Sequence, residues 1–343
     1  MQYTEFRARL LGWYGAQARD LPWRKDRDPY RVWVSEIMLQ QTRVAAVIDH
    51  YHEFLRRFPT VEKLAAAREA SVLAAWSGLG YYRRARMLHA AAKVIVREKK
   101  GEFPATSDGW RELPGIGRYT AAAIASIAFN EAVAVVDGNV ERVIERIAGK
   151  RLVGEAFWTE AQALLDAARP GDFNQAMMEL GATICTPRAP ACLTCPVADL
   201  CVTRGELPAT EKGPRQKKRE IHFVLCCERD RVLLVQRPRD ASLMAGMWEL
   251  PETTGAHPGT KQIPRSARND KSNVMFSLKH SITVTDYTVR VWRQAANGAQ
   301  GEWVNVKRLK GLALTGLARK ILRKADLFPE KPVRKLHASD SRV

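Results

Sequence analysis

Four cysteines of the sequence lie close enough together to hold a metal. They follow the spacing Cys185-x6-Cys192-x2-Cys195-x5-Cys201, so four of the six thiols fall within 17 residues. Thiolates at this spacing can surround one soft metal centre, either an iron–sulfur cluster or zinc. Zinc ribbons generally use two separated Cys-x2-Cys pairs, and this segment has one such pair. Four unrelated cysteines are the alternative interpretation.

A second chemical signal is the string SDGWRELPGIGRYT at Ser107–Thr120. Gly115 and Gly117 let the backbone approach another surface closely, and a helix that begins after them turns its unpaired N–H groups outward. Such groups can hold a phosphate oxygen. An ordinary turn between two helices also needs glycines, but the whole Leu-Pro-Gly-Ile-Gly-Arg string is more specific than its glycines alone.

Together these motifs resemble a known family. The hairpin string is similar to the helix-hairpin-helix of the endonuclease III-like DNA glycosylases, and the cysteine spacing resembles their [4Fe–4S] loop. Within that superfamily the chain resembles the MutY-type adenine DNA glycosylases, over nearly all of residues 1–205 and more weakly over 220–324. The supporting segments are LPWR (Leu21–Arg24), SEIMLQQT (Ser35–Thr42), GLGYY (Gly78–Tyr82) and VDGNV (Val136–Val140).

The resemblance gives two carboxylates a role that neither would have alone. Taken singly, Glu36 could lie on a solvated helix face and Asp137 could be a helix N-cap. Cleavage of an N-glycosidic bond needs one carboxyl that is protonated near neutral pH and one that stays ionised beside the sugar cation. The resemblance implies that Glu36 protonates adenine N7 and activates water, while Asp137 stabilises the sugar. It also implies that Asn139 and Tyr119 position the acid and the sugar.

Tyr119 also predicts what the enzyme does after base release. Bifunctional relatives that resemble endonuclease III carry a lysine at this hairpin position, and that lysine forms a Schiff base with the sugar. A phenol cannot form this imine. We therefore predict a monofunctional glycosylase that leaves an abasic site and has little lyase activity.

Extrusion of adenine from the duplex costs stacking and pairing energy, which inserted side chains can offset. The resemblance assigns Gln41 and Tyr82 to the stack beside an opposing 8-oxoguanine. Trp23, Tyr81 and Tyr82 could instead be helix-packing aromatics, and for Tyr81 we favour packing. The substrate-binding residues expected in this domain are Leu21, Trp23, Arg24, Gln41, Thr42 and Tyr82. The residues expected to hold DNA at the hairpin are Leu113, Gly115, Gly117 and Arg118.

The segment SLMAGMWELP (Ser242–Pro251) resembles the Nudix-like C-terminal domain of the same family, which reads the lesion opposite adenine. Hydrolytic Nudix domains need several glutamates to hold magnesium, and between Glu252 and Val291 we find only two aspartates. Pyrophosphate hydrolysis is therefore excluded. We expect His280 and Thr283 to contact the lesion, although the family's Phe-Ser-His reads Ile-Thr-Val at 282–284.

An all-α domain over residues 1–205 has to position the catalytic residues, the hairpin and the cysteine loop. Apolar side chains recur every three or four positions in segments that end near Pro and Gly. These helical segments are Tyr30–Ile48, Val61–Ser77, Arg83–Glu98, Val140–Ala148 and Phe157–Ala168. A basic linker follows at 206–219, then a smaller α+β Nudix-like domain at 220–324 and a basic tail at 325–343. The expected strands of the Nudix-like domain are Ile221–Cys227, Val232–Gln236, Ser281–Trp292 and Gly301–Val304, and its closing helix is expected at Leu312–Lys324.

The charge supports a nucleic-acid partner. The chain has 55 Lys and Arg against 37 Asp and Glu, a net charge of +18, and 46% hydrophobic residues exclude a disordered or collagenous chain. Residues 206–343 carry a net +13, and residues 1–205 carry +5. The N-terminal segment does not resemble a signal peptide. We expect a monomer in the bacterial cytoplasm that acts on double-stranded DNA with adenine opposite 8-oxoguanine or guanine.

Three other functions fit the sequence less well than adenine excision does. An endonuclease III-like glycosylase for oxidised pyrimidines is opposed by Tyr119 and by the second domain. A non-catalytic DNA-binding protein that senses redox state is opposed by the retention of Glu36 and Asp137. A Nudix hydrolase with a helical appendage lacks the acids that would bind its metal.

Overall fold

The computed structural model describes residues 3–207, 217–241, 244–252, 274–282, 285–293 and 300–328. The chain divides into two compact units. The first unit comprises Met1–Ala75 and Arg83–Glu211, and the second comprises Trp76–Tyr82 and Lys212–Val343. The division at Glu211 falls within the expected linker.

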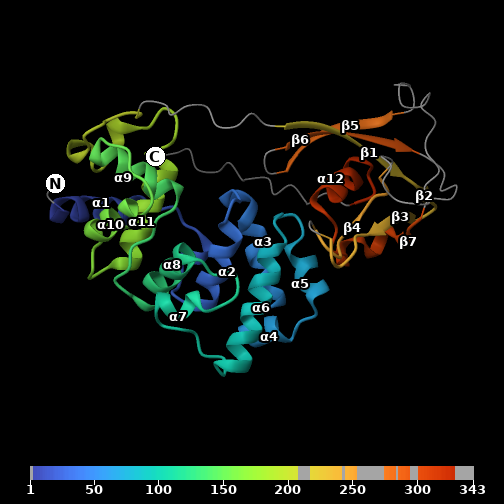
Figure 1. Ribbon diagram of the computed structural model, residues 1–343, viewed down its shortest axis with the longest axis horizontal. Coiled ribbons are helices and arrows are strands. Elements are labelled where there is room, and N and C mark those ends of the chain that lie inside the picture. The colour runs from blue at the N-terminus through green and yellow to red at the C-terminus, as the bar shows by residue number, and fades with distance from the viewer. Residues whose placement is uncertain are drawn as a thin grey trace, which may run out of the picture. The chain divides into compact units, whose positions relative to one another are not determined.

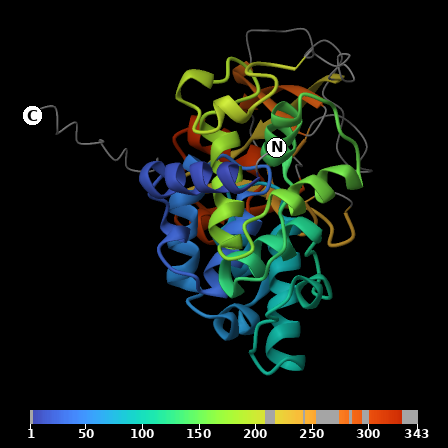
Figure 2. The same ribbon diagram turned by 90° about the vertical axis from the view of Figure 1, so that its left-hand side faces the viewer.

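The described part of the first unit is helical, with no strand in it (Figure 1). Its helices are α1 (Tyr3–Gln17), α2 (Pro29–Leu39), α3 (Val44–Arg57), α4 (Val61–Ala66), α5 (Glu69–Trp76), α6 (Arg83–Glu98), α7 (Ser107–Arg111), α8 (Arg118–Phe129), α9 (Gly138–Ala148), α10 (Glu155–Leu164) and α11 (Pro170–Thr183). Helix α2 packs against α3, α6 and α8, and α1 lies across α11 (Figure 2). Alanines and isoleucines of α8 are fully buried, which lets α2 and α11 approach it closely.

Two expected helices are each divided in two. The predicted helix Tyr30–Ile48 is wrong as one element, because α2 ends at Leu39 and Gln41 adopts a left-handed backbone with φ of 52°. The Arg84 guanidinium donates to the Ile37 and Met38 carbonyls at 2.9 and 3.1 Å, so a side chain from α6 satisfies the last turn. The predicted helix Val61–Ser77 likewise breaks after Ala66.

The described part of the second unit contains two small sheets and one short α-helix. Strand β1 (Lys217–Leu225) pairs in parallel with β6 (Thr285–Arg293), which pairs antiparallel with β5 (Val274–Ile282). In the other sheet β3 (Arg231–Gln236) pairs with β2 (Cys227–Glu228), β4 (Trp248–Glu249) and β7 (Glu302–Asn305). The apolar side chains of α12 (Gly316–Lys324) are buried in the core of this unit.

The expected strand Ser281–Trp292 is wrong as a single strand. Its described residues belong to two strands, β5 and β6, which form an antiparallel pair in which His280 faces Tyr287 across the ladder. No strand was predicted for residues 274–280, which the structure places in β5. Thr283 lies outside the described residues. Among the described helices, none is long and apolar enough to cross a membrane.

Candidate active site

A cavity of about 610 Å³ in the first unit gathers the predicted catalytic residues. Its walls come from the segment before α2, from α2 itself, from the start of α8, from the start of α9 and from α11. The predicted residues that line it are Leu21, Trp23, Arg24, Glu36, Gln41, Thr42, Gly117, Tyr119, Asp137 and Asn139. Segments more than 100 positions apart thus supply a single site.

Glu36 projects from α2 with only 6% of its surface exposed. Helix α2 begins after an Asp28 N-cap and places Pro29 at its first position, where proline is well tolerated. Burial is the largest influence on Glu36 and raises its pKa to about 7. The hydrogen bond from Tyr119 opposes this rise, the negative charge of Asp137 adds to it, and the positive charge of Arg24 opposes it. Glu36 can therefore hold or release a proton near neutral pH.

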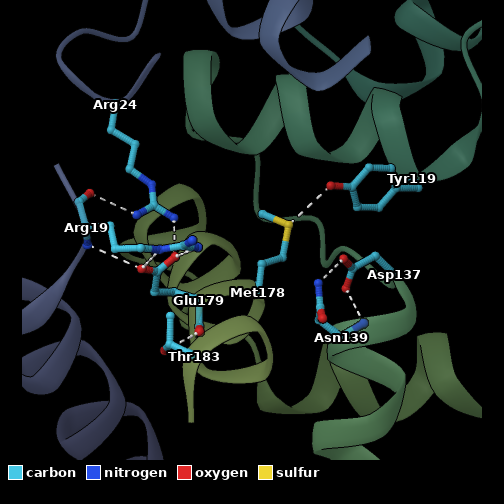
Figure 3. Close-up of polar contacts among 8 residues, drawn as sticks. All are labelled: Arg19, Arg24, Tyr119, Asp137, Asn139, Met178, Glu179 and Thr183. Atoms are coloured by element: carbon cyan, nitrogen blue, oxygen red, sulfur yellow. Dashed lines mark hydrogen bonds and ion pairs between the residues drawn. The ribbon is translucent and has the colours of Figure 1, made fainter. Parts of the chain in front are cut away.

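Tyr119 lies in the first turn of α8 and donates its hydroxyl hydrogen to Glu36 Oε2 at 2.9 Å. The hydroxyl also lies 3.2 Å from Met178 Sδ, toward which the ring points (Figure 3). Burial, then the charges of Glu36 and Asp137, raise the pKa of Tyr119 well above its ordinary value. The phenol therefore remains a neutral donor that orients the Glu36 carboxyl.

Asp137 is the N-cap of α9, which confirms the N-cap interpretation, and it also lines the cavity. Its Oδ1 accepts from the backbone N–H groups of Asn139 and Val140 at 3.0 and 2.8 Å, and its Oδ2 accepts from Asn139 Nδ2 at 2.9 Å. The Asp137 carboxyl therefore lies at the N-terminus of α9, held by two backbone N–H groups and one side-chain amide. Glu36 and Asp137 thus occupy contrasting environments within one cavity.

Asn139 is held in place by Arg142 and Gly181. Arg142 Nη2 donates to Asn139 Oδ1 at 2.9 Å and to the Gly181 carbonyl at 2.7 Å, while its Nε donates to the Cys185 carbonyl at 2.7 Å. A methyl group at Gly181 would lie 2.6 Å from Asn139 Cβ, so this close approach requires glycine. The cavity wall is thereby joined to the beginning of the cysteine loop.

The four loop cysteines line one small cavity together with Arg146. All are free thiols, and Arg146 Nη1 lies within hydrogen-bonding distance of Cys185 Sγ, at 3.3 Å. No group of three or more His, Cys, Asp or Glu side chains in the described ranges is arranged to hold a single metal ion. The donor set of four thiols beside a cation nevertheless fits an anionic iron–sulfur cluster.

The hairpin between α7 and α8 has the predicted glycine geometry. Gly115 has φ of 76°, and a methyl group there would lie 2.4 Å from Met87 Cβ, whereas Gly117 caps α8 in an extended conformation. The Leu113 side chain is buried, so it supports the hairpin instead of facing outward as a DNA contact would. Arg118 is exposed, pairs with Glu155 at 2.6 Å and lies over the Trp158 ring.

The two tyrosines of the GLGYY motif lie in the opposite way to our expectation. Tyr82 is only 4% exposed, and within the second unit its hydroxyl donates to the Leu314 carbonyl at 2.8 Å. Tyr81 is 47% exposed in a left-handed conformation, with φ of 46°. Tyr82 is thus a packing residue in this structure, and Tyr81 presents the accessible ring. His280 lies partly buried on β5 of the second unit.

Sequence analysis missed several residues that line the cavity. Arg19 precedes α2, and Gln175, Met178 and Glu179 come from α11. Glu179 is the most informative of them, because an almost fully buried carboxylate needs a cationic partner. Its position between Met178 and Leu180 was the only signal in the sequence, and this position does not identify the partner.

Three family models match the chain. The model described as HhH-GPD superfamily base excision DNA repair protein matches residues 34–152. The iron–sulfur binding domain of endonuclease III matches residues 185–201, and a NUDIX domain matches residues 221–324. These matches confirm the predicted fold class of a helical glycosylase domain with an iron–sulfur loop and a Nudix-like C-terminal domain.

Known proteins give the same result. The chain is 43% identical to an adenine DNA glycosylase of Mus musculus, over 73% of this chain and 61% of the relative. It is 28% identical to an adenine DNA glycosylase of Buchnera aphidicola subsp. Baizongia pistaciae, over 93% of this chain and 96% of that one. The chain thus spans less than two thirds of the mouse relative's length.

Among solved structures, a thermostable thymine-DNA glycosylase matches with a TM-score of 0.56 and 31% identity. The match covers 59% of this chain and 96% of that structure's chain. The chain therefore belongs to the HhH-GPD superfamily of base excision DNA repair proteins and is similar, within it, to adenine DNA glycosylases.

Proposed function

We propose that this protein hydrolyses the N-glycosidic bond of adenine in double-stranded DNA, where adenine faces 8-oxoguanine or guanine. The observation that carries the proposal is the buried Glu36, with its pKa raised to about 7, in the same cavity as the helix-capping carboxylate of Asp137. Adenine DNA glycosylases among the relatives support the choice of base.

The two carboxyl groups have separate tasks in the proposed reaction. Glu36 gives its proton to N7 of an extruded adenine, so that the glycosidic electron pair leaves with a neutral base. Asp137, whose carboxyl is held at the N-terminus of α9, faces the positive charge that develops on the sugar. The Glu36 carboxylate then removes a proton from the water that attacks the sugar, which regenerates the acid.

Tyr119 supports a monofunctional reaction. Its hydroxyl is bound to Glu36, and a phenol offers no amine for a Schiff base with the sugar. The product is therefore a duplex with an abasic site and an unbroken strand. Of the aromatics considered for the base stack, we propose that the exposed Tyr81 takes this role. Gln41 of the first unit is also exposed, in keeping with the role that the resemblance implies for it.

We further propose that the four cysteines hold a [4Fe–4S] cluster and that the Nudix-like unit reads the opposing lesion through its β5–β6 segment. A thiolate-bound cluster would supply structural cross-linking of the loop, with Arg146 balancing part of its negative charge. The basic excess of residues 206–343 supports attraction to phosphates, which salt would weaken.

Single-turnover excision on duplexes that pair adenine with 8-oxoguanine, guanine or cytosine tests the proposal. We expect adenine release from the first two, with strand scission only after added base. Glu36→Gln should abolish release while duplex binding persists. Release of thymine from a thymine–guanine mispair in place of adenine would overturn the substrate, and full activity of the Glu36 variant would overturn the mechanism.

A further inference from the structure

Glu179 forms the centre of an ion-pair cluster in the cavity wall. Its side chain, on α11, is 1% exposed. Its Oε1 accepts from the backbone N–H and the Nε of Arg19, at 3.2 and 2.6 Å. Its Oε2 accepts from Arg19 Nη2 at 2.7 Å and from Arg24 Nη2 at 2.9 Å (Figure 3). One buried carboxylate therefore holds two guanidinium groups.

Arg24 is fixed by this carboxylate and by two further contacts. Its Nη1 donates to the Arg19 carbonyl at 3.2 Å, and its guanidinium lies 5.4 Å from the centre of the Tyr14 ring. Arg19, Arg24 and Glu179 all line the cavity that contains Glu36. The positive charge of Arg24 acts on Glu36, since it is one of the two influences that favour ionisation of that carboxyl.

We infer that Glu179 is a positioning residue that holds Arg24 in the cavity wall and balances the two cations, so that Glu36 can stay protonated until it meets the base. The inference rests on the proposed role of Glu36 as the acid. With Glu179 ionised, the three-residue cluster carries one net positive charge, and without it the cluster carries two. An additional positive charge at a poorly solvated site favours the Glu36 carboxylate and so removes the acid.

Glu179 itself keeps its charge over the pH range in which Glu36 titrates. Burial opposes its ionisation, but the hydrogen bonds from Arg19 and Arg24 outweigh burial and lower its pKa to about 2. The other ionisable groups that act on Glu36 are Tyr119 from α8 and Asp137 at the start of α9. The cluster on the α11 side is therefore the cationic influence on Glu36, and Glu179 limits its strength.

The test is the pH profile of single-turnover adenine excision by the full chain. Glu179→Gln keeps the shape of the side chain and removes its charge. We expect the alkaline limb of the profile to move to lower pH by about 0.5 to 1 unit, so the rate falls by about three- to ninefold at pH 8 and by less than about twofold at pH 6. Glu179→Asp, which retains the charge, should restore most of the wild-type profile.

Two further variants separate positioning from a structural role. Arg19→Gln removes a cation from the same cluster and should move the limb toward higher pH, opposite to Glu179→Gln. In an Arg24→Gln background, Glu179→Gln should produce a smaller shift, because Arg19 is then the only cation of the cluster that it leaves unbalanced. A purely structural loss would lower the rate equally at every pH and would not change sign between these variants.

Difference infrared titration of the Glu36 carboxyl, with Glu36→Gln as the reference, provides a readout that does not need turnover. Here also Glu179→Gln should lower the titration midpoint. If the wild-type protein releases no adenine, the proposed function fails, yet the infrared midpoint still reports on the cluster. If adenine is released and depends on Glu36, but neither midpoint moves in Glu179→Gln, the inference alone is overturned.

Discussion

The hydroxyl of Tyr119 donates a hydrogen bond to Oε2 of Glu36 across 83 positions of sequence, at 2.9 Å. This contact opposes burial, because it stabilises the ionised form of a carboxyl whose burial favours the protonated one. The balance leaves the pKa of Glu36 at about 7, within the range where an acid can also act as a base in the next step.

Tyr119→Phe should therefore have two effects of different kind. Loss of the donor raises the pKa of Glu36 further, so the alkaline limb of the excision profile moves to higher pH. Loss of the orienting bond lowers the maximal rate, by about tenfold. Tyr30→Phe is the matched control, since its buried hydroxyl donates to the Phe58 carbonyl and it does not line the cavity. If the alkaline limb of Tyr119→Phe stays at the wild-type pH, the Tyr119 hydroxyl does not influence the pKa of Glu36.

Burial of Glu36 should also make the free energy of unfolding depend on pH. The unfolded carboxyl titrates near its ordinary value of 4.5 and the folded one near 7, so the folded state binds more protons between these values. Stability then falls as the pH rises through this window, by up to about 3 kcal/mol at pH 8.

Glu36→Gln removes this dependence, so the variant should exceed the wild-type protein in stability at pH 8 and match it more closely near pH 4.5. Urea unfolding at both values measures the difference. Asp108→Asn provides the same change of charge at an exposed position and should leave the pH dependence as it is. Equal free energies of unfolding for the wild type and Glu36→Gln at pH 8 would show that the buried Glu36 carboxyl does not destabilise the folded protein.

The contact between α11 and the start of α9 predicts the effect of a single methyl group. Gly181→Ala would place Cβ 2.6 Å from Asn139 Cβ and 2.9 Å from its carbonyl oxygen. We expect a loss of about 1–3 kcal/mol in stability and a rate of excision at least about tenfold lower, because Asn139 and with it Asp137 must move.

Gly12→Ala in α1 is the control for this substitution. A Cβ at Gly12 meets no atom within 4 Å, so the change should leave excision unaltered and stabilise the helix by about 0.5–1 kcal/mol. Chemical denaturation and single-turnover rates for both variants check the contrast. Wild-type activity in Gly181→Ala would mean that the Asn139 position is not required.

Local patterns in the sequence were sufficient to predict the elements that form through contacts between neighbouring residues. The amphipathic period of Arg83–Glu98 predicts α6 with its observed bounds, and the glycine string predicts the hairpin before α8. Such features depend on neighbouring residues and on backbone geometry, which the sequence states directly. The spacing of the four cysteines belongs to the same class.

Tertiary structure decided the features that depend on partners far along the chain. The break after Leu39 follows from the Arg84 guanidinium, which no pattern within 30–48 contains. The exposure of Tyr81 and burial of Tyr82 follow from the Leu314 carbonyl. The charge state of Glu36 depends on groups contributed by three other segments, because only folding sets the distances and the burial that govern electrostatic interactions.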